Sequence, residues 1–394
     1  MHLVLLGALW IVAVPAAGTC LYLLALTLLS GSLAPLPPSQ RRLRFDVVVP
    51  AHNEEAVLSR VLASLRALDW PADQFRMVVI ADNCTDATAA VAAAAGAHVM
   101  KRVDAEQRGK GYALAFAFMA SRARGWADAV VVVDADAQVS ANLLEAFARR
   151  LERGEHAVQA HYGVSNAGAS WRTRLLSIAK AAFHIVRSRA RERLKLSCGI
   201  RGNGWAVTHA LLERVPYRAF SLTEDLEYGI ALVLAGYRVA YADEADADAE
   251  MVTGERDARR QRQRWERGRF ELVRTRTLPL LAQALRRRSA VCLDLALDLL
   301  VLPLSYVVLN VALLGVLAAL AARGSADTRA WLWVTAACGG ALLLHILRGW
   351  QLSGVGLRGL LDLARAPFFL VWKILVMVSG RGSREWVRTK REGT

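Results

Sequence analysis

Two aspartates, Asp134 and Asp136, stand one residue apart directly after the valine-rich run 129–133. Carboxylates this close repel each other, which is costly unless a cation lies between them. Hard divalent ions such as Mg²⁺ and Mn²⁺ bind carboxylates together with the phosphate oxygens of a substrate. The pair therefore predicts a Mg²⁺ or Mn²⁺ site, formed by Asp134 and Asp136, that binds a diphosphate.

A second acidic pair, Glu224 and Asp225, follows Thr223 and precedes the apolar stretch 226–234. One interpretation is structural, because an acidic residue in the first turn of a helix complements the helix dipole. The other is chemical, because a carboxylate can take a proton from an attacking hydroxyl group. We expect Asp225 to be such a general base, with Glu224 as its neighbour in the pocket.

Apolar runs without polar alternation are typical of strands buried on both faces of a parallel sheet. Such runs, the predicted strands, lie at 45–49, 75–80, 129–133 and 237–241. Helices are expected between them at 54–68, 86–95, 110–122 and 141–153, the last capped by Ser140. The predicted fold class is α/β, with a mainly parallel sheet and helices on both of its faces.

Polar residues follow these strands, at 50–55 and 82–86 as well as at Asp134. Ligands bind at the carboxyl ends of the strands in open sheets of this kind. Capping of the next helix is an alternative for Asn53 and Asp86. His52, His161 and His184 are expected to be structural or exposed, and the acidic stretch 243–250 to be a solvated loop.

The membrane segments stand apart from this domain. No charged side chain occurs from Leu3 to Leu29, which at ~1.5 Å per residue is enough for a helix to cross a hydrocarbon core of ~30 Å. A cleaved signal peptide is the alternative. Further apolar blocks at 299–322 and 330–347 predict a transmembrane hairpin, and the shorter block 367–378 an interfacial or re-entrant segment.

Basic residues orient these segments. Arg41, Arg42 and Arg44 follow the first span, which places the N-terminus outside and the catalytic domain in the cytoplasm. The basic tail stays inside as well, so three crossings are expected, with four as the alternative. The Ala- and Arg-rich composition favours a bacterial inner membrane protein.

The chain is both apolar and strongly positive, with 55% hydrophobic residues and a formal net charge of +15. Eight basic residues lie in 171–195 and twelve arginines in 256–288. Because these runs flank the membrane segments, we expect them to lie on anionic lipid headgroups rather than on nucleic acid. The five cysteines form no CxxC pair, so neither a zinc site nor a disulfide framework is expected.

These expectations divide the chain into an N-terminal transmembrane helix, a cytoplasmic catalytic domain, two basic interfacial segments, a transmembrane hairpin and a tail. Their predicted limits are 1–40, 41–255 (with the first interfacial segment at 168–195), 256–290, 291–350 and 351–394.

Six short motifs occur in a fixed order along residues 45–275. They are Val49-Pro50-Ala51-His52-Asn53-Glu54-Glu55, Ala81-Asp82-Asn83-Cys84-Thr85-Asp86, Arg108-Gly109-Lys110-Gly111, Asp134-Ala135-Asp136, Thr223-Glu224-Asp225 and Gln261-Arg262-Gln263-Arg264-Trp265. The series resembles a membrane-embedded family 2 glycosyltransferase with the GT-A fold. More narrowly, it is similar to the processive synthases of cellulose, chitin, hyaluronan and poly-N-acetylglucosamine.

The resemblance implies a role for each motif. Pro50, Asn53 and Glu54 would border the nucleotide, Asp82 would bind the uracil ring, and Lys110 would lie near the donor diphosphate. Asp134 and Asp136 would hold the metal and the nucleotide-sugar, and Asp225 would be the base. Gln261, Arg264 and Trp265 would close over the donor, with Trp265 also forming a floor for the acceptor sugar.

A glycine-rich stretch precedes the Asp225 helix, and family members similar to this chain line their acceptor site there. Glycine allows the backbone to approach a sugar closely, and an aromatic ring can stack on one. We therefore expect Gly202, Asn203, Gly204 and Trp205 to contact the acceptor. A structural turn is the alternative for Gly202 and Gly204.

The leading hypothesis is an inverting, metal-dependent transferase that moves a sugar from a UDP-sugar to a growing polysaccharide at the inner membrane. The first alternative is a non-processive enzyme that glycosylates a lipid or lipid-linked oligosaccharide. The second is a non-catalytic membrane scaffold that binds nucleotide-sugar. A nicotinamide enzyme is excluded, because no GxGxxG motif follows the first strand.

Overall fold

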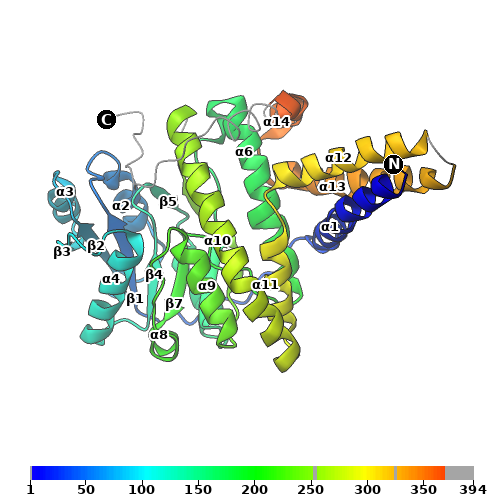
Figure 1. Cartoon of the computed structure of the whole chain (residues 1–394). Helices are drawn as coiled ribbons and strands as arrows, with labels where there is room; N and C mark the ends of the chain where they lie inside the picture. Colours follow the sequence, from blue (N-terminus) through cyan, green and yellow to red (C-terminus); the bar gives the residue numbers. More distant parts are fainter. Residues whose placement is uncertain (1, 252–254, 324–325, 369–394) are drawn as a thin grey trace.

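The computed structural model describes residues 2–251, 255–323 and 326–368 of the chain. A sheet domain lies at one side, and three long apolar helices, α1, α12 and α13, project from the other (Figure 1). Helices α6, α10 and α11 stand between them (Figure 1). The catalytic and membrane parts expected from the sequence are therefore joined by a helical layer.

One sheet of eight strands forms the domain, in the order β3-β2-β1-β4-β7-β6-β8-β5. Its strands are β1 (Phe45–Ala51), β2 (Phe75–Asp82), β3 (His98–Arg102), β4 (Ala129–Val132), β5 (Ala137–Val139), β6 (Ala157–His161), β7 (Trp205–Thr208) and β8 (Ala240–Ala249). β1 is parallel to β2 and β4, whereas β7 is antiparallel to β4 and β6. The sheet is thus mixed, with a parallel half that contains the three Val-rich runs.

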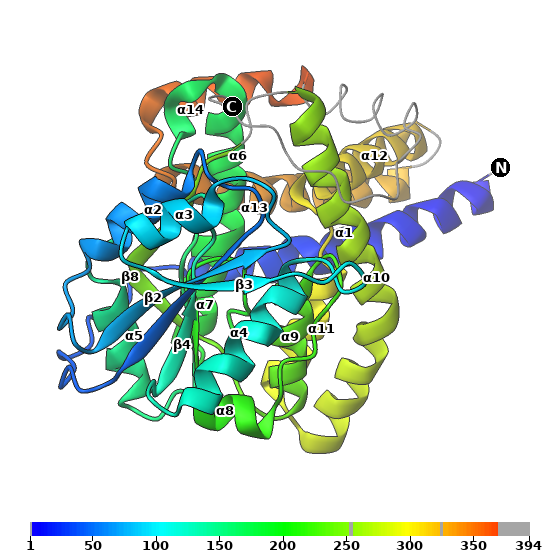
Figure 2. The ribbon, with the colours of Figure 1, turned by 90° about the vertical axis from the view of Figure 1, so that its left-hand side faces the viewer.

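Helices cover both faces of this sheet, as predicted (Figure 2). Apolar side chains of α2, α3 and α5 pack on one face, and those of α4, α8 and α9 on the other. These helices are α2 (Leu58–Arg66), α3 (Thr88–Ala94), α4 (Lys110–Arg124), α5 (Leu143–Leu151), α8 (His209–Arg214) and α9 (Glu224–Leu234). The burial of valine and leucine on both faces of the sheet supplies the main stabilisation of the domain.

Three local predictions are wrong. The stretch 243–250 is not a loop, because β8 extends to Ala249 with alanines buried and acidic residues outward. α2 begins at Leu58 rather than at residue 54, since Asn53 has a left-handed backbone (φ 56°). Ser140 does not cap α5 through its side chain, because its hydroxyl accepts a hydrogen bond from the backbone N–H of Asp246.

Three helices are long and apolar enough to cross a membrane: α1 (His2–Leu28), α12 (Leu304–Ala322) and α13 (Ala330–Leu352). They pack together around a shared apolar core. The three predicted segments therefore exist as helices, while their orientation stays a prediction. Most of the predicted interfacial segment 367–378 lies outside the described residues.

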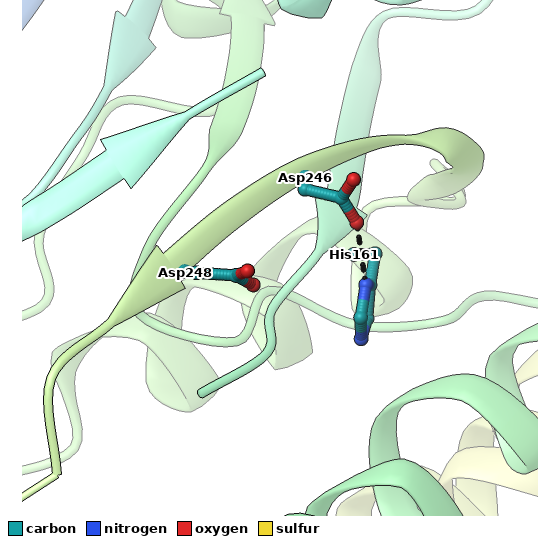
Figure 3. Close-up of side chains that lie close together, drawn as sticks. All are labelled: His161, Asp246 and Asp248. Atoms are coloured by element: carbon teal, nitrogen blue, oxygen red, sulfur yellow. Dashed lines mark hydrogen bonds and ion pairs between the residues drawn. The ribbon is translucent and has the colours of Figure 1, made fainter. Parts of the chain in front are cut away.

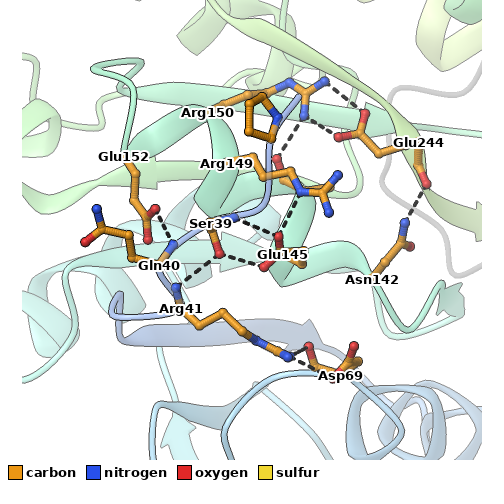
Figure 4. A network of polar contacts seen from close by, with 12 residues as sticks. Ser39, Gln40, Arg41, Asp69, Asn142, Glu145, Arg149, Arg150, Glu152 and Glu244 are labelled. Carbon is orange, nitrogen blue, oxygen red and sulfur yellow. Dashed lines mark hydrogen bonds and ion pairs between the residues drawn. The ribbon is translucent and has the colours of Figure 1, made fainter. Parts of the chain in front are cut away.

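The linker between α1 and β1 is fixed to the catalytic domain (Figure 4). The backbone N–H and the hydroxyl of Ser39 both donate to the carboxylate of Glu145, at 2.9 and 2.6 Å. Arg41 forms an ion pair with Asp69 at 2.7 Å. The first basic residues after the predicted span therefore bind the domain itself.

The remaining helices form the layer between the sheet and the apolar helices. They are α6 (Trp171–Ala181), a π-helical turn (Ala182–Val186), α7 (Arg187–Arg193), α10 (Glu255–Arg287), α11 (Ala290–Leu300) and α14 (Gly356–Asp362), with short 3₁₀ turns at Ala167–Ala169, Ala326–Arg329 and Leu363–Arg365. α11 packs against α9 and α10 and contains Leu299, the predicted start of the apolar hairpin. The hairpin therefore begins later than predicted, at Leu304 of α12. Gly349 of α13 lies against Ala182, where a Cβ would approach within 2.8 Å.

Two arginines of the basic segment 171–195 lie inside the protein, while the position of the segment on lipid headgroups stays a prediction. Arg187 and Arg191 are buried, and both form ion pairs with Asp298 of α11. Arg191 also pairs with Asp294, which accepts a hydrogen bond from the Tyr22 hydroxyl of α1. These arginines therefore connect three helices inside the protein.

Candidate active site

A cavity of about 1660 Å³ connects the sheet to the apolar helices. At one end it is lined by residues that follow β1, β2 and β4, together with the first residues of α4 and α9. At the other end it is lined by α6, the segment before α12, and α13. The carboxyl ends of the parallel strands therefore open into this cavity, as the fold class predicts.

Lys110 lies at the centre of the polar end. Its Nζ atom is 2.6 Å from Oδ1 of Asp134 and 3.6 Å from Oε1 of Glu224. It also donates a hydrogen bond to the backbone carbonyl of Gly202 at 2.6 Å. Burial alone would lower the pKa of Lys110, but Asp134 and Glu224 outweigh it, so the pKa is raised. Lys110 is a cation that joins the two acidic pairs.

The position of Lys110 depends on a close contact at the start of α4. A Cβ on Gly111 would lie 2.3 Å from the carbonyl oxygen of Ala219. Only glycine allows the first turn of α4 to approach this loop. Gly111, the second glycine of the Gly-Lys-Gly motif, thus allows Lys110 to lie close to the start of α9.

Glu224 and Asp225 begin α9 and line the cavity. Burial raises the pKa of Glu224 to about 7, although Lys110 opposes the shift, and the neighbouring Asp225 adds to it. Burial also raises the pKa of Asp225, against the backbone N–H of Leu226 and the charge of Lys110. A carboxylate with a raised pKa accepts a proton more readily, which suits a general base.

Gly202 forms the wall of the cavity directly beside Asp225. Its φ is 88°, and a Cβ there would lie 3.3 Å from Oδ2 of Asp225. Glycine adopts this left-handed backbone without strain and leaves room at the carboxylate. Gly202 therefore lies where a substrate hydroxyl would have to approach Asp225.

Three of the further predicted acceptor residues, Asn203, Gly204 and Trp205, do not line the cavity, and these predictions are corrected. Trp205 is 1% exposed and packs against Phe118 and Tyr228 in the core. Gly204 approaches Ala247, so its conformation serves strand packing. Asn203 is fully buried.

Asn203 instead supports the aspartate pair. Its Oδ1 accepts a hydrogen bond from the backbone N–H of Asp134 at 2.9 Å, and its Nδ2 donates to the carbonyl of Ala247 at 3.1 Å. The side chain thereby ties the end of β4 to β8. A buried asparagine beside a glycine gives the same sequence signal as an exposed one, so the pattern could not separate the two roles.

The loops after β1 and β2 are bound to each other. Oδ1 of Asn53 accepts a hydrogen bond from the backbone N–H of Thr85 at 2.7 Å. The backbone N–H of Glu54 donates to Thr88 Oγ1 at 2.8 Å. Pro50, Asn53, Glu54 and Asp82 all line the cavity. Asp82 already pairs with Arg102 at 2.7 Å, which leaves its second carboxylate oxygen for a ligand.

Asp134 and Asp136 both line the cavity, and their donor set fits a hard divalent cation. A second possible metal-binding group lies nearby on β6 and β8, where ligand atoms of His161, Asp246 and Asp248 lie within 4.8 Å of one another (Figure 3). Nδ1 of His161 forms a hydrogen bond with Oδ1 of Asp246 at 2.7 Å. This contact is consistent with the structural role that we expected for His161. These three residues do not line the cavity.

The motif Gln261-Arg262-Gln263-Arg264-Trp265 lies in the first part of α10. The side chains of Gln261, Arg264 and Trp265 lie outside the described part of the structure. Their predicted contacts with donor and acceptor stay predictions.

Basic residues of the cavity wall were missed as site residues. Lys180, Arg187, Arg201 and Arg269 all line the cavity. Lys180 of α6 lies 3.4 Å from the centre of the Tyr162 ring and donates to the carbonyl of Gly163. The sequence interpretation placed the segments of Lys180, Arg187 and Arg269 on lipid, and in the glycine-rich stretch that contains Arg201 it considered only the neighbouring residues.

Comparisons with known proteins identify the family of the chain. A family model described as "Glycosyltransferase like family 2" matches residues 42–268, more than half of the chain. The probable glycosyltransferase YdaM of Bacillus subtilis (strain 168) is 26% identical over 268 residues, which cover 64% of this chain and 60% of the relative. A beta-monoglucosyldiacylglycerol synthase of Synechocystis sp. is 28% identical over 254 residues, which cover 62% of this chain and 50% of the relative. The chain thus matches only about half to three fifths of the length of these relatives.

A solved structure shares the fold. The mannosyltransferase PcManGT from Pyrobaculum calidifontis, in complex with GDP-Man and Mn²⁺, superposes with a TM-score of 0.53 at 20% identity. The match covers 87% of this chain and 98% of PcManGT. With the GT-A architecture and the matched family region, the chain belongs to glycosyltransferase family 2 and is a glycosyltransferase.

Proposed function

We propose that the enzyme transfers one sugar from a nucleotide-sugar to the hydroxyl group of a lipid acceptor that enters from the membrane. The observation that carries this proposal is the continuity of the cavity. Its polar end contains Lys110, Asp134 and Asp225, while its other end is lined by apolar residues of the candidate membrane helices and the segment before them, Leu302, Leu304, Val308 and Ile346. An acyl chain would bury apolar surface there while the headgroup reached Asp225.

The chain's own residues support an inverting transfer. Asp225 would take the proton of the acceptor hydroxyl as its oxygen attacks the anomeric carbon, on the face opposite the leaving nucleotide. Lys110 would lie against the negative charge that grows on the leaving diphosphate. Asp134 and Asp136 would hold Mg²⁺ or Mn²⁺, which neutralises part of that charge when bound.

Donor selection is proposed from the resemblance. The loop residues Asn53 and Glu54 would border the nucleotide, and the free carboxylate oxygen of Asp82 would accept a hydrogen bond from a uracil ring. Pro50 would shape the same wall. A UDP-sugar is therefore the proposed donor. Because the fold neighbour PcManGT was solved with GDP-Man, donor tests need both nucleotides.

The relatives favour a lipid over a polysaccharide product. Beta-monoglucosyldiacylglycerol synthase, by its name, makes a glucosylated diacylglycerol. A growing polysaccharide remains the second candidate, because the Gln261-to-Trp265 motif resembles that of processive synthases.

Product analysis tests this choice. Purified full-length protein in lipid nanodiscs would receive UDP-glucose, UDP-N-acetylglucosamine, UDP-galactose, UDP-glucuronate or GDP-mannose, each carrying a radiolabelled sugar. We expect labelled product to partition into the organic phase and to contain a single sugar. Water-insoluble or high-molecular-weight product would contradict the proposal and support the polymer. Asp225→Asn is the inactive control.

A further inference from the structure

We propose that Arg187, Arg201 and Arg269, grouped around Phe183, bind the phosphate of an anionic lipid headgroup, so that the acceptor is a phosphate-bearing lipid with a free hydroxyl group. This inference rests on the proposed function and narrows its acceptor. A neutral acceptor such as diacylglycerol would leave these three guanidinium groups, which we call the arginine cluster, without a ligand.

The geometry of the arginine cluster is that of a lined pocket. The guanidinium carbons of Arg201, Arg187 and Arg269 lie 4.3, 4.8 and 5.9 Å from the centre of the Phe183 ring. All four residues line the cavity. Cation–π contact with the ring holds the guanidinium planes but uses none of their N–H donors. Arg187 donates to Asp298, and Arg269 donates to backbone carbonyls. The guanidinium group of Arg201 makes no hydrogen bond to another residue in the described part of the chain.

Several arginines surround one carboxylate beside the cavity. Arg191 and the arginine cluster hold the pKa of Asp298 well below its usual range: burial would raise it, but the arginines outweigh burial. Asp294 is a second carboxylate, bound to Arg191. Glu266, also in the cavity wall, accepts a hydrogen bond from Tyr306, and the charge of Arg201 also opposes the rise in the pKa of Asp225.

Individual donors are also unsatisfied. The Nε atoms of Arg187 and Arg201 are buried and have no hydrogen-bond partner among the described residues. The two side chains are 3% and 7% exposed. Arg187 reaches Asp298 at 3.0 Å, but Arg201 only at 3.8 Å, beyond hydrogen-bond distance. Leaving a buried charged donor unpaired is costly, so a bound anion would stabilise both groups.

The arginine cluster lies between the general base and the membrane end of the cavity. Arg201 precedes Gly202, whose Cα faces the carboxylate of Asp225. Arg269 donates to the carbonyl of Val301 at 2.7 Å, in the segment that leads into α12. A phosphate held here would point its headgroup hydroxyl toward Asp225 and its acyl chains toward α12 and α13. The oxygen of that hydroxyl would bond to the anomeric carbon, the bond to the nucleotide diphosphate would break, and the proton would pass to Asp225.

The phosphate of a lipid and the diphosphate of the donor could both bind to arginine. The test must therefore distinguish binding of the lipid from binding of the donor. Full-length protein would be assayed for sugar transfer to phosphatidylglycerol and to diacylglycerol in mixed micelles, and for UDP binding by calorimetry. The variants are Arg201→Gln, Arg201→Lys and Arg187→Gln. The control is Arg189→Gln. Arg189 lies on α7, like Arg187, but it pairs with Asp243 at 2.7 Å and does not line the cavity.

We expect Arg201→Gln to raise the KM for phosphatidylglycerol about tenfold, the loss of one charge-assisted hydrogen bond, with UDP affinity unchanged. Arg201→Lys should recover part of the loss, and Arg189→Gln should behave as wild type. Thermal unfolding would identify any variant that fails to fold. An unchanged KM in folded Arg201→Gln, or an equal loss of UDP affinity, would overturn the assignment. Wild-type transfer to diacylglycerol alone would overturn it too but leave the proposed function standing, whereas polymer formation would refute the proposed function.

Discussion

Nη2 of Arg191 lies 2.8 Å from Oδ1 of Asp298, and both side chains are almost completely buried. The pair joins α7, the continuation of the basic segment from α6, to α11, which follows the long helix α10. Because Arg187 shares the same carboxylate oxygen, Asp298 is the acidic centre of the layer between the sheet domain and the apolar helices.

Removing the charge of Asp298 is therefore expected to destabilise the protein strongly. Asp298→Asn would leave buried guanidinium groups without their carboxylate, at a cost of about 3–5 kcal/mol. Thermal unfolding in detergent measures the loss. The matched control is Asp69→Asn, which removes an exposed pair with Arg41 and should cost less than about 1 kcal/mol. Equal effects of the two variants would show that the buried network contributes little.

Asp225→Asn is expected to lower kcat by about 10²- to 10⁴-fold, the usual contribution of a general base. Donor binding should persist, because the amide keeps the shape of the side chain. Release of UDP measures kcat, and calorimetry with UDP measures binding. Glu213→Gln, at an exposed pair with Arg122, serves as control. Unchanged UDP release in Asp225→Asn would exclude this residue as the base.

The pH profile should show the raised pKa values at the start of α9. A base must be deprotonated, and carboxylates with raised pKa values bind protons at higher pH than free ones do. Burial raises the pKa of Asp225, so we expect kcat/KM to fall with falling pH at a higher pH than an ordinary aspartate would give. Lys110 opposes that rise, so Lys110→Met should move the acid limb to still higher pH. A limb near pH 4 in the wild type would contradict this prediction.

Chelation tests the metal site of the aspartate pair. We expect EDTA to abolish transfer and Mg²⁺ or Mn²⁺ to restore it, because the leaving diphosphate needs a counter-charge. Asp136→Asn should weaken metal binding and raise the metal concentration needed for half-maximal activity, whereas Asp246→Asn, in the group on β6 and β8, should leave that concentration unchanged. The metal concentration for half-maximal activity distinguishes them. A shift confined to Asp246→Asn would place the functional metal at His161, Asp246 and Asp248 instead.

Much of the domain follows from short-range patterns in the sequence. The runs that begin at Phe45, Phe75 and Ala129 are mostly apolar and rich in valine, so they predicted β1, β2 and β4. Strands β3, β5 and β6 were missed because they are short or contain polar residues, and only their neighbours in the sheet stabilise them. The alternation of alanine and acidic residues in β8 did carry a strand signal, which its high charge obscured.

The site divides in the same way. Lys110, Asp134 and Asp225 follow strands or begin helices, so a motif and a fold class together predicted that they would meet. The acceptor predictions at Asn203 and Trp205 were wrong because a tryptophan beside glycines looks alike in a cleft and in a core. Pairs such as Arg191 with Asp294 join segments 103 residues apart, and no local pattern reveals which charges such a contact will neutralise.

The π-helical turn at Ala182–Val186 fixes the rotational phase of α7. A π turn holds one residue more than an α-helical turn, and each helical residue advances the chain by about 100° around the axis. Deleting a single residue here would swing Arg187 and Arg191 away from Asp298. The number of residues between α6 and α7 is therefore fixed. We expect substitutions on the outer face of the π-helical turn to be tolerated, but insertions and deletions within the turn to disrupt the ion pairs with Asp298.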